Sequence, residues 1–262
     1  MSHHSSALLS PEAEIGEGVE VGPFAIVEAG ARVGDGCTIE GSAQIRRGAV
    51  LGQDCFVGAG AIVGGDPQFR GFDRSIASGV RIGSGNILRE HVTVHRSIHE
   101  GGQTVLGSGN YLMAGAHVGH DCILGDENTL ANNVLLAGHV EFGSQCFVGG
   151  GSVFHQFVRV GDLVMVQGIS GFSLDLPPFV LAAEVNTVVG LNAVGLKRAA
   201  VPPKERAALK EAFRRIYRSP QSLAETLAET DESEMGPALQ LFYGFLRSPS
   251  KKGFCIRSRD GD

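Results

Sequence analysis

The sequence predicts a parallel β-helix followed by an α-helical C-terminal domain, and two observations lead to this prediction. An aliphatic or Phe residue recurs at every sixth position through most of residues 15–172, a period that fits neither an amphipathic helix nor a hairpin meander. The period stops after Phe172, where prolines and helical patterns replace it. Because one hexad can form a short strand and a turn, three hexads close a triangular coil. We place the β-helix in residues 1–190 and the helical domain in residues 191–262.

The recurring residue, called here the inward residue, should point into the prism and stack on its counterpart in the next coil, about 4.8 Å away. A small residue stands two positions before it, and Gly often follows it. We expect this Gly to supply the φ values that a tight corner needs. The inward residues are Ile15, Val21, Val27, Val33, Ile39, Ile45, Leu51, Val57, Val63, Ile82, Leu88, Val94, Leu106, Leu112, Val118, Leu124, Leu130, Leu136, Phe142, Val148, Phe154, Val160, Val166 and Phe172.

Two breaks interrupt the hexads, at residues 64–81 and 95–104. The first break contains Gln68, Arg70 and Arg74. A rigid solenoid commonly acquires a binding site through loops of this kind, although tolerated insertions would give the same pattern. We therefore expect both breaks to be loops that project from the prism.

The composition suits a narrow prism. The chain has 262 residues with 38 Gly, 3 Tyr and no Trp, and its net charge of −6 argues against a nucleic-acid binder. No apolar run reaches ~18 residues, and the N-terminus lacks the apolar centre of a signal peptide. We expect a cytoplasmic protein without an integral membrane segment. Cys37, Cys55, Cys122 and Cys146 occupy the small position before an inward residue, so we expect reduced thiols packed in the core.

The helical domain follows the prism in a clear order. Pro177 and Pro178 end the hexads, and residues 185–195 are expected to form a connector. A helix is predicted to begin after Pro202 and Pro203. The three predicted helices cover residues 204–217, 221–229 and 238–246.

Residues 197–218 are strongly basic, although the whole chain is acidic. A solvated helix face is one explanation, and a docking surface for an acidic partner is the other. The candidate docking residues are Lys197, Lys204, Arg206, Lys210, Arg214 and Arg215.

Three histidines, His120, His139 and His155, follow inward residues at the same corner of three successive coils, and His117 should face outward beside them. Aliphatic residues already fill the core positions, so this column predicts a functional site. Three imidazoles can bind zinc. One His with a carboxylate can instead act as a general acid or base, and Asp121 follows His120 directly. The second option fits better, since a zinc hydrolase does not need a basic C-terminal helix.

Several segments resemble the UDP-N-acetylglucosamine O-acyltransferase family, whose reaction begins lipid A synthesis. The resemblance covers nearly the whole chain. It implies a left-handed β-helix, a homotrimer with active sites between subunits, and transfer of an R-3-hydroxyacyl group from acyl carrier protein to the 3-hydroxyl of UDP-N-acetylglucosamine. It implies neither a metal nor a cofactor besides the carrier-protein thioester. The segments are Ala116-His117-Val118-Gly119-His120-Asp121-Cys122, Leu130-Ala131-Asn132-Asn133, Leu136-Ala137-Gly138-His139-Val140, His155-Gln156-Phe157 and Gly195-Leu196-Lys197-Arg198.

The resemblance also implies roles for individual residues. His120 matches the general base, Asp121 the carboxylate that orients it, and the N–H of Gly138 the donor to the oxyanion. Gly168 matches the position where the family closes its hydrocarbon groove, and Met113 lies nearby. A Gly there leaves the groove open, which favours a longer acyl chain. The residues expected around the sugar nucleotide are Gln68, His117, His139, His155, Gln156, Asn192 and Arg198.

The first loop departs from the family, because Arg70 or Arg74 stands where a Lys is common. A 3-amino sugar acceptor, which gives an amide, is therefore a second possibility. A sugar acetyltransferase that uses coenzyme A is a third, and a zinc-dependent trimer similar to carbonic anhydrase is a fourth. The N-acyltransferase acting later in the pathway usually has an N-terminal uridine-binding domain, for which a repeat that begins by Ile15 leaves no room.

Overall fold

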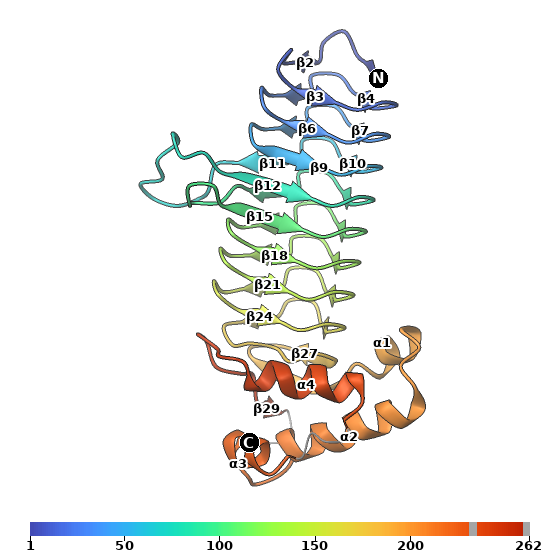
Figure 1. Ribbon diagram of the computed structural model, residues 1–262, viewed down its shortest axis with the longest axis vertical. Coiled ribbons are helices and arrows are strands. Elements are labelled where there is room, and N and C mark those ends of the chain that lie inside the picture. The colour runs from blue at the N-terminus through green and yellow to red at the C-terminus, as the bar shows by residue number, and fades with distance from the viewer. Residues whose placement is uncertain (231–234, 259–262) are drawn as a thin grey trace.

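The computed structural model describes residues 1–230 and 235–258, and it confirms the predicted β-helix (Figure 1). Three sheets, named here A, B and C, run along the prism with 12, 9 and 8 strands. The chain passes through A, B and C in turn as it completes one coil. In Figure 1 the strands of sheet C run from left to right across the front while the chain descends, so the coil is left-handed.

Most strands are two residues long, as the hexads predict. Sheet A contains β1 (Ser2–His3), β4 (Glu20–Val21), β7 (Thr38–Ile39), β10 (Phe56–Val57), β13 (Ile87–Leu88), β16 (Tyr111–Leu112), β19 (Thr129–Leu130), β22 (Phe147–Val148), β25 (Met165–Val166), β27 (Val180–Ala183), β28 (Thr187–Leu191) and β29 (Arg257–Ser258). Sheet B contains β2 (Leu8–Leu9), β5 (Ile26–Val27), β8 (Gln44–Ile45), β11 (Ile62–Gly65), β14 (Thr93–His95), β17 (His117–Val118), β20 (Leu135–Leu136), β23 (Val153–Phe154) and β26 (Gly171–Phe172). Sheet C contains β3 (Glu14–Ile15), β6 (Arg32–Val33), β9 (Ala49–Leu51), β12 (Gly79–Ile82), β15 (Gln103–Leu106), β18 (Ile123–Leu124), β21 (Glu141–Phe142) and β24 (Arg159–Val160).

Glycine follows the inward residue of every strand in sheet C, but the expected reason for it is wrong. None of these glycines has a left-handed φ. A Cβ on Gly16 would lie 2.3 Å from Oδ1 of Asp35, and one on Gly34 would lie 2.6 Å from the carbonyl carbon of Gly52. Successive coils therefore approach too closely here for a side chain. The left-handed residue stands two positions later, as at Gly18 with a φ of 67°.

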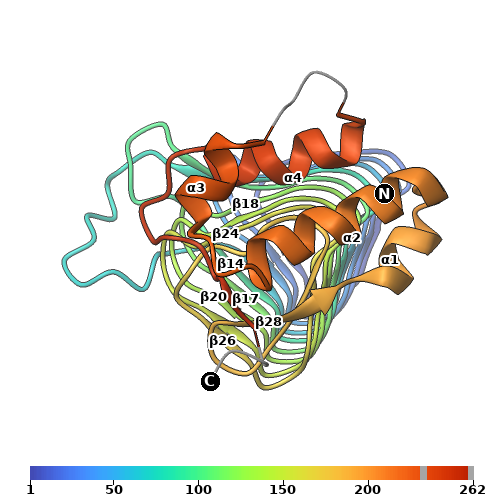
Figure 2. The ribbon, with the colours of Figure 1, turned by 90° about the horizontal axis from the view of Figure 1, so that it is seen from below.

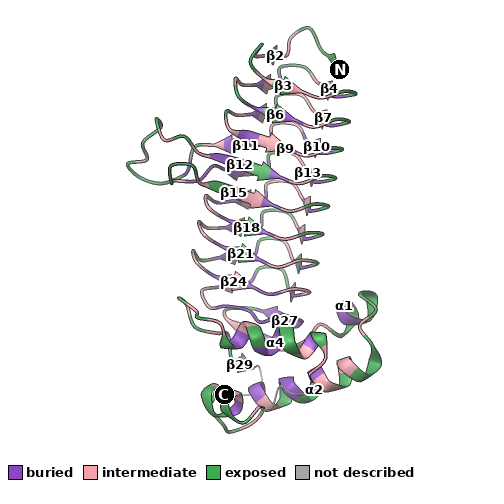
Figure 3. Ribbon diagram, viewed as in Figure 1, coloured by how far each residue is buried: buried purple, intermediate pink, exposed green. Residues whose placement is uncertain are grey.

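The inward residues and the small residues before them form one continuous buried core, seen as the purple strand segments in Figure 3. Cys37, Cys55, Cys122 and Cys146 are buried and form no disulfide, which confirms the prediction that they are reduced thiols packed in the core. The N–H of Cys55 donates a hydrogen bond of 3.4 Å to Sγ of Cys37 in the preceding coil. These thiols therefore serve as small core residues.

A buried asparagine ladder interrupts the apolar core. Asn86, Asn110 and Asn128 occupy the small position of sheet A in three successive coils, and each is fully buried. Nδ2 of Asn110 donates to Oδ1 of Asn86 at 3.0 Å, and the N–H of Asn128 donates to Oδ1 of Asn110 at 2.9 Å. Because each asparagine forms a hydrogen bond with the next one, these polar side chains can be buried in the interior of the prism.

Asn110→Ala is expected to lower the free energy of unfolding by about 2 kcal/mol or more. The substitution leaves Oδ1 of Asn86 and the N–H of Asn128 with fewer partners while both remain buried. Urea titration followed by circular dichroism measures the change. Exposed Asn132→Ala is the control and should change the free energy by less than about 0.5 kcal/mol. Equal stability of the two variants would contradict a structural role for the ladder.

Two segments leave the prism between sheets B and C and project to the left in Figure 1. Residues 66–78 join β11 to β12, and residues 96–102 join β14 to β15. We call them the first and second loops. The strands beside the loops keep their parallel pairing, since Phe56 pairs with Ile87 across the first insertion. The scaffold therefore keeps its parallel pairing, with a register shift between Val63 and Gly65 where β11 meets β14, while both loops gather at one edge.

The helical domain covers the C-terminal end of the prism (Figure 2). It contains α1 (Ala193–Arg198), α2 (Pro203–Tyr217), α3 (Leu223–Ala228) and α4 (Pro237–Arg247), and the last three confirm the predicted helices. In the described residues, no helix has the length and apolar character that a membrane crossing requires.

Both ends of the prism extend beyond the predicted repeat. The first coil begins at β1, before Ile15, and β28 pairs antiparallel with β27 where the sequence predicts only a connector. This hairpin, with β29 beside it, covers the last edge of sheet A. An uncovered edge would present unpaired backbone groups, which explains why the connector forms a strand.

A buried ion pair fastens the chain after α4 to the last coil. Nε of Arg159 donates to the fully buried Asp175 at 2.8 Å, and Nη1 of Arg159 donates to Oγ of Ser248 at 2.8 Å. The N–H of Cys255 donates to the carbonyl of Asp175 at 2.8 Å. The tail, defined as residues 248–256, is therefore held against the prism at both of its ends.

Candidate active site

His120, His139 and His155 lie on the edge between sheets B and C, where the hexad spacing predicts them. We call these three residues the imidazole column. The rings of His120 and His139 meet edge to face with centroids 5.1 Å apart. Both loops project from the same edge, so they enclose the upper part of the column.

His120 and Asp121 form a hydrogen-bonded pair. Nδ1 of His120 lies 2.8 Å from Oδ2 of Asp121. A carboxylate at this nitrogen holds the proton on Nδ1, which leaves Nε2 of the neutral ring as a proton acceptor. The pair therefore has the arrangement that a general base requires.

The second loop holds the Asp121 carboxylate in place. The hydroxyl of Ser97 donates a short hydrogen bond to Oδ1, and the N–H of Ile98 donates to Oδ2 at 3.2 Å. Burial raises the pKa of Asp121, but the hydrogen bonds from Ser97, His120 and Ile98 outweigh it, and the pKa falls below its ordinary value. Asp121 consequently stays ionised beside the imidazole.

Gly138 lies directly against the ring of His120. A Cβ on Gly138 would come 2.4 Å from Cε1 and 2.5 Å from Nε2 of His120. Gly138 is buried, and across residues 1–230 and 235–258 its N–H donates to no other group. A donor beside Nε2 is thus available to a bound oxyanion.

His139 belongs to the same cluster. Its Nε2 lies 3.9 Å from Oδ2 of Asp121, and its ring stacks on Phe157 with centroids 4.7 Å apart. Burial is the main reason that the pKa of His139 is lowered, although the charge of Asp121 raises it. His139 therefore tends to be neutral and able to accept or donate one hydrogen bond.

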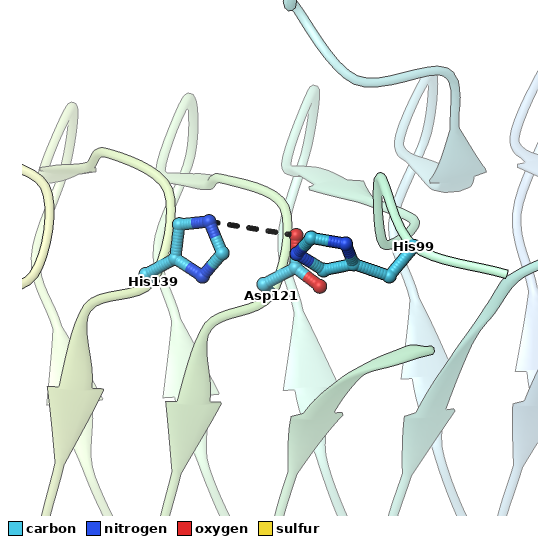
Figure 4. Close-up of side chains that lie close together, drawn as sticks. All are labelled: His99, Asp121 and His139. Carbon is cyan, nitrogen blue, oxygen red and sulfur yellow. Dashed lines mark ion pairs between the residues drawn. The ribbon is translucent and has the colours of Figure 1, made fainter. Parts of the chain in front are cut away.

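His99, on the second loop, approaches this cluster and was missed by the sequence analysis. One ligand atom each from His99, Asp121 and His139 lie within 4.8 Å of one another (Figure 4). Such a donor set can hold a divalent cation after small rotations, but both oxygens of Asp121 already accept hydrogen bonds. The structure does not test the prediction that the enzyme works without a metal ion.

Gln68, His117 and His155 line one groove of about 530 Å³ on sheet B. Nδ1 of His117 lies 2.7 Å from Oγ1 of Thr93, and its ring meets that of His95 with centroids 4.8 Å apart. The structure therefore brings these three predicted residues together. His95 was not predicted, because the sequence analysis placed it in the second break, whereas it is the last residue of β14.

Acid is expected to destabilise the fold through His95. Burial, with the nearby charges of His117 and His120, lowers the pKa of His95 from 6.5 to about 4. On acidification, the His95 imidazole of the unfolded chain binds a proton before the buried imidazole of the folded chain does. The contribution of neutral His95 to the free energy of unfolding is therefore complete above pH 6.5, and it is lost as the pH falls from 6.5 to about 4. The free energy of unfolding should fall by about 2 kcal/mol from about pH 7.5 to about pH 5 through this group alone. Urea titrations of the wild type and His95→Gln measure it, and identical pH dependence would refute the account.

The tail contributes two residues that the sequence analysis missed. Nζ of Lys252 lies 3.3 Å from Nδ1 of the exposed His155, and Nζ of Lys251 lies 4.8 Å from the centroid of the Phe157 ring. Gln156 is exposed beside them. Only the return of the chain from α4 brings these residues together, so no local pattern indicates them.

Four other predicted residues lie away from the imidazole column in one chain. Asn192 and Arg198 line a cavity of about 760 Å³ on sheet A. Asn192 caps α1 by accepting from the N–H of Gly195 at 2.9 Å. Met113 and Gly168 lie on the edge between sheets A and B. One chain alone therefore does not assemble all the predicted residues.

The predicted docking residues lie on or beside α1 and α2. Lys197, Lys204, Lys210 and Arg214 are exposed, whereas Arg206 and Arg215 are half-buried. Arg206, Lys210 and Arg214 line a cavity of about 710 Å³ together with apolar side chains. This surface combines positive charge with a hydrophobic floor.

Comparisons with known proteins agree with the fold. A model of bacterial transferase hexapeptide repeats matches residues 12–47 and 103–138, and a model described as UDP-N-acetylglucosamine O-acyltransferase, domain 2, matches residues 175–255. An acyl-[acyl-carrier-protein]–UDP-N-acetylglucosamine O-acyltransferase of Anaeromyxobacter dehalogenans is 41% identical over 257 residues, which cover 96% of this chain and 98% of the relative.

Solved structures give the same result. The UDP-N-acetylglucosamine acyltransferase of Francisella novicida superposes with a TM-score of 0.93 at 30% identity, covering 98% of this chain and 95% of that one. The enzyme of Campylobacter jejuni superposes with a TM-score of 0.88 at 34% identity, covering 96% and 98%. Sequence identity and coverage of this extent show that the chain belongs to the acyl-[acyl-carrier-protein]–UDP-N-acetylglucosamine O-acyltransferase family.

Proposed function

We propose that this acyltransferase moves an R-3-hydroxyacyl group from acyl carrier protein to the 3-hydroxyl of UDP-N-acetylglucosamine, as the first step of lipid A synthesis in the cytoplasm. The observation that carries the proposal is the contact between His120, Asp121 and Gly138. Nδ1 of His120 is held by Asp121, and the buried Gly138 lies against Nε2. Acyl transfer needs a base and an oxyanion donor side by side, which this contact supplies.

In the proposed reaction, Nε2 of His120 takes the proton of the sugar 3-hydroxyl as the oxygen attacks the thioester carbonyl. The new C–O bond gives a tetrahedral intermediate whose oxyanion accepts a hydrogen bond from the N–H of Gly138. Asp121 stabilises the imidazolium that forms. Collapse breaks the C–S bond, and the imidazolium returns its proton to the carrier thiolate. The products are the ester and the free carrier thiol.

The groove lined by Gln68, His117 and His155 is the proposed place of the sugar. His139 and Gln156, which are close in sequence to the lining residues Ala137 and His155, are assigned to the sugar as well. Asn192 and Arg198 are assigned to the nucleotide, and Met113 and Gly168 to the acyl chain. These four residues lie on sheet A or on the edge between sheets A and B. Their distance from the imidazole column in one chain supports a homotrimer in which a neighbouring copy supplies them.

The basic surface of α2 is the proposed docking site for acyl carrier protein. Lys204, Lys210 and Arg214 are exposed on it, and Arg206 and Arg215 are half-buried, while Lys197 is exposed on α1. Positive charge there attracts an acidic carrier and increases the rate of encounter, an effect that salt weakens. The carrier would then deliver its acyl thioester toward the helical end of the prism.

The first experiment incubates the purified protein with R-3-hydroxyacyl carrier proteins of several chain lengths and UDP-N-acetylglucosamine. Mass spectrometry detects the acylated sugar nucleotide, and NMR identifies the acylated position. We expect a 3-O-acyl product, with longer chains favoured because Gly168 adds no side chain to the groove. Absence of product at every length would overturn the proposal.

A 3-amino acceptor is the second candidate, suggested by the first loop, where Arg70 or Arg74 replaces the common Lys and Arg74 pairs with Asp66 at 2.9 Å. Offering both UDP-sugars in one tube decides which acceptor is used. Because His99, Asp121 and His139 could hold a metal ion, the assay is repeated in the presence of the chelator EDTA. We expect EDTA to leave the rate unchanged, whereas a loss restored by Zn²⁺ would favour a zinc-dependent enzyme.

A further inference from the structure

The tail carries two ammonium groups to the active-site edge of the prism. Lys251 and Lys252 stand between two anchored points, because Oγ of Ser248 accepts from Arg159 at 2.8 Å on one side and Gly253 bonds through its carbonyl to the N–H of Asp175 at 2.9 Å on the other. The N–H groups of Lys252 and Gly253 both donate to Oγ of Ser250, at 3.1 Å and 2.8 Å. The tail is thus a fixed turn rather than a loose end.

Lys251 extends the stack that begins at the catalytic pair. Its Nζ lies 4.8 Å from the centroid of Phe157, Phe157 stacks on His139 at 4.7 Å, and His139 meets His120 at 5.1 Å. The positive charge of Lys251 also contributes to the lowered pKa of His139. A cation held over an aromatic face keeps its other side open to an anion.

Lys252 lies next to the last member of the imidazole column. Its Nζ is 3.3 Å from Nδ1 of His155. An ammonium group only donates, so the tautomer of His155 that accepts from Lys252 has its ring proton on Nε2, whereas the approach of Nδ1 to the carbonyl oxygen of Gln156 at 3.4 Å belongs to the other tautomer. In the first of these tautomers, His155 offers an N–H donor on its exposed side.

Neither lysine forms an ion pair with a carboxylate anywhere in residues 1–230 or 235–258. Two cations without a carboxylate partner in the described residues, beside imidazole donors, form a surface that favours the oxygens of a phosphate group. Both substrates of the proposed reaction carry phosphate. The sugar nucleotide has a pyrophosphate, and the carrier arm has a phosphodiester.

We propose that Lys251 and Lys252 bind a phosphate group of one substrate at the tail side of the imidazole column. This inference rests on the proposed function for the identity of the phosphate. The chemistry is the same for the pyrophosphate of UDP-N-acetylglucosamine and for the phosphodiester of the phosphopantetheine arm. The two sources are separated by measuring each ligand alone.

Isothermal titration calorimetry provides a test that needs no turnover. We would titrate UDP-N-acetylglucosamine, and separately R-3-hydroxyacyl-phosphopantetheine and R-3-hydroxyacyl-pantetheine, into the wild type and Lys251→Ala/Lys252→Ala. We expect the Kd of one phosphate-bearing ligand to rise about tenfold or more, because charge-assisted hydrogen bonds are lost. A change for the sugar nucleotide identifies the pyrophosphate. A change for acyl-phosphopantetheine but not for acyl-pantetheine identifies the phosphate of the carrier arm, which this probe presents as a monoester.

Two controls separate this role from a structural one. Lys251→Arg/Lys252→Arg keeps both charges and should bind within about threefold of the wild type. Arg32→Ala removes an exposed cation at the other end of the prism and should leave every Kd unchanged. Unchanged affinity in the double alanine variant, or a wild type that binds none of the phosphate-bearing ligands, would overturn the inference. Failure of the proposed function would appear differently, as intact binding without an acylated product.

Discussion

His120→Ala is expected to lower kcat for acyl transfer by about 10³-fold, within the range typical of a lost general base. The proposed substrate contacts from Gln68, His117 and His155, which line one groove, remain, so KM should change little. The hydroxyl then attacks the thioester without a group to take its proton. Steady-state kinetics with R-3-hydroxyacyl carrier protein and UDP-N-acetylglucosamine measure the effect.

Two further variants test whether the loss of rate is specific to the His120–Asp121 pair. Asp121→Asn keeps the size of the side chain but removes the charge that stabilises the imidazolium, so we expect a smaller loss than for His120→Ala. His4→Ala changes a histidine of the first coil and should leave kcat unchanged. A His120→Ala enzyme with more than about a tenth of the wild-type kcat would remove His120 from the role of general base.

Gly138→Ala is expected to lower kcat by about 10²-fold or more while the protein stays folded. The φ of Gly138 is not left-handed, so the backbone accepts alanine, but the new Cβ would stand 2.4 Å from Cε1 of His120. The ring has to move away from its hydrogen bond with Asp121, which displaces Nε2 from the reacting hydroxyl. A displacement of about 1 Å at a catalytic group costs rate on this scale.

Thermal unfolding and kinetics are measured together for this variant. Gly244→Ala is the matched control, since a Cβ there meets nothing within 4 Å and the position lies in α4. We expect its kcat to equal that of the wild type and its Tm to rise slightly, because alanine favours a helix more than glycine does. A Gly138→Ala enzyme with normal kcat would show that the contact with His120 does not matter for catalysis.

The sequence by itself determined the parts of this protein that repeat. Because one inward residue per hexad must be apolar for every coil to close, the period reveals the prism, its corners and the interruptions at the two loops. The same register places His120, His139 and His155 on one edge before any coordinate is known. The sequence also shows directly that Asp121 follows His120.

For some residues the sequence pattern was recognised correctly, but its structural reason was not. Gly after the inward residues of sheet C reads as a corner residue, yet Gly16 and Gly34 are required because neighbouring coils nearly touch. The family resemblance predicts that Asn192 binds the nucleotide, and the structure shows that its side-chain oxygen caps α1. Spacing along one chain does not encode the distance between two passes of the backbone.

Only the tertiary structure decided which non-repeating residues join the site. Ser97 and Ile98 hold Asp121 because the second loop folds over the edge, and Lys251 and Lys252 reach Phe157 and His155 because Arg159 and Asp175 fasten the tail. A hexad repeat fixes positions through a regular hydrogen-bonded ladder, so local sequence is enough to predict it. Loops and tails are placed by single long-range contacts, which leave no period in the sequence.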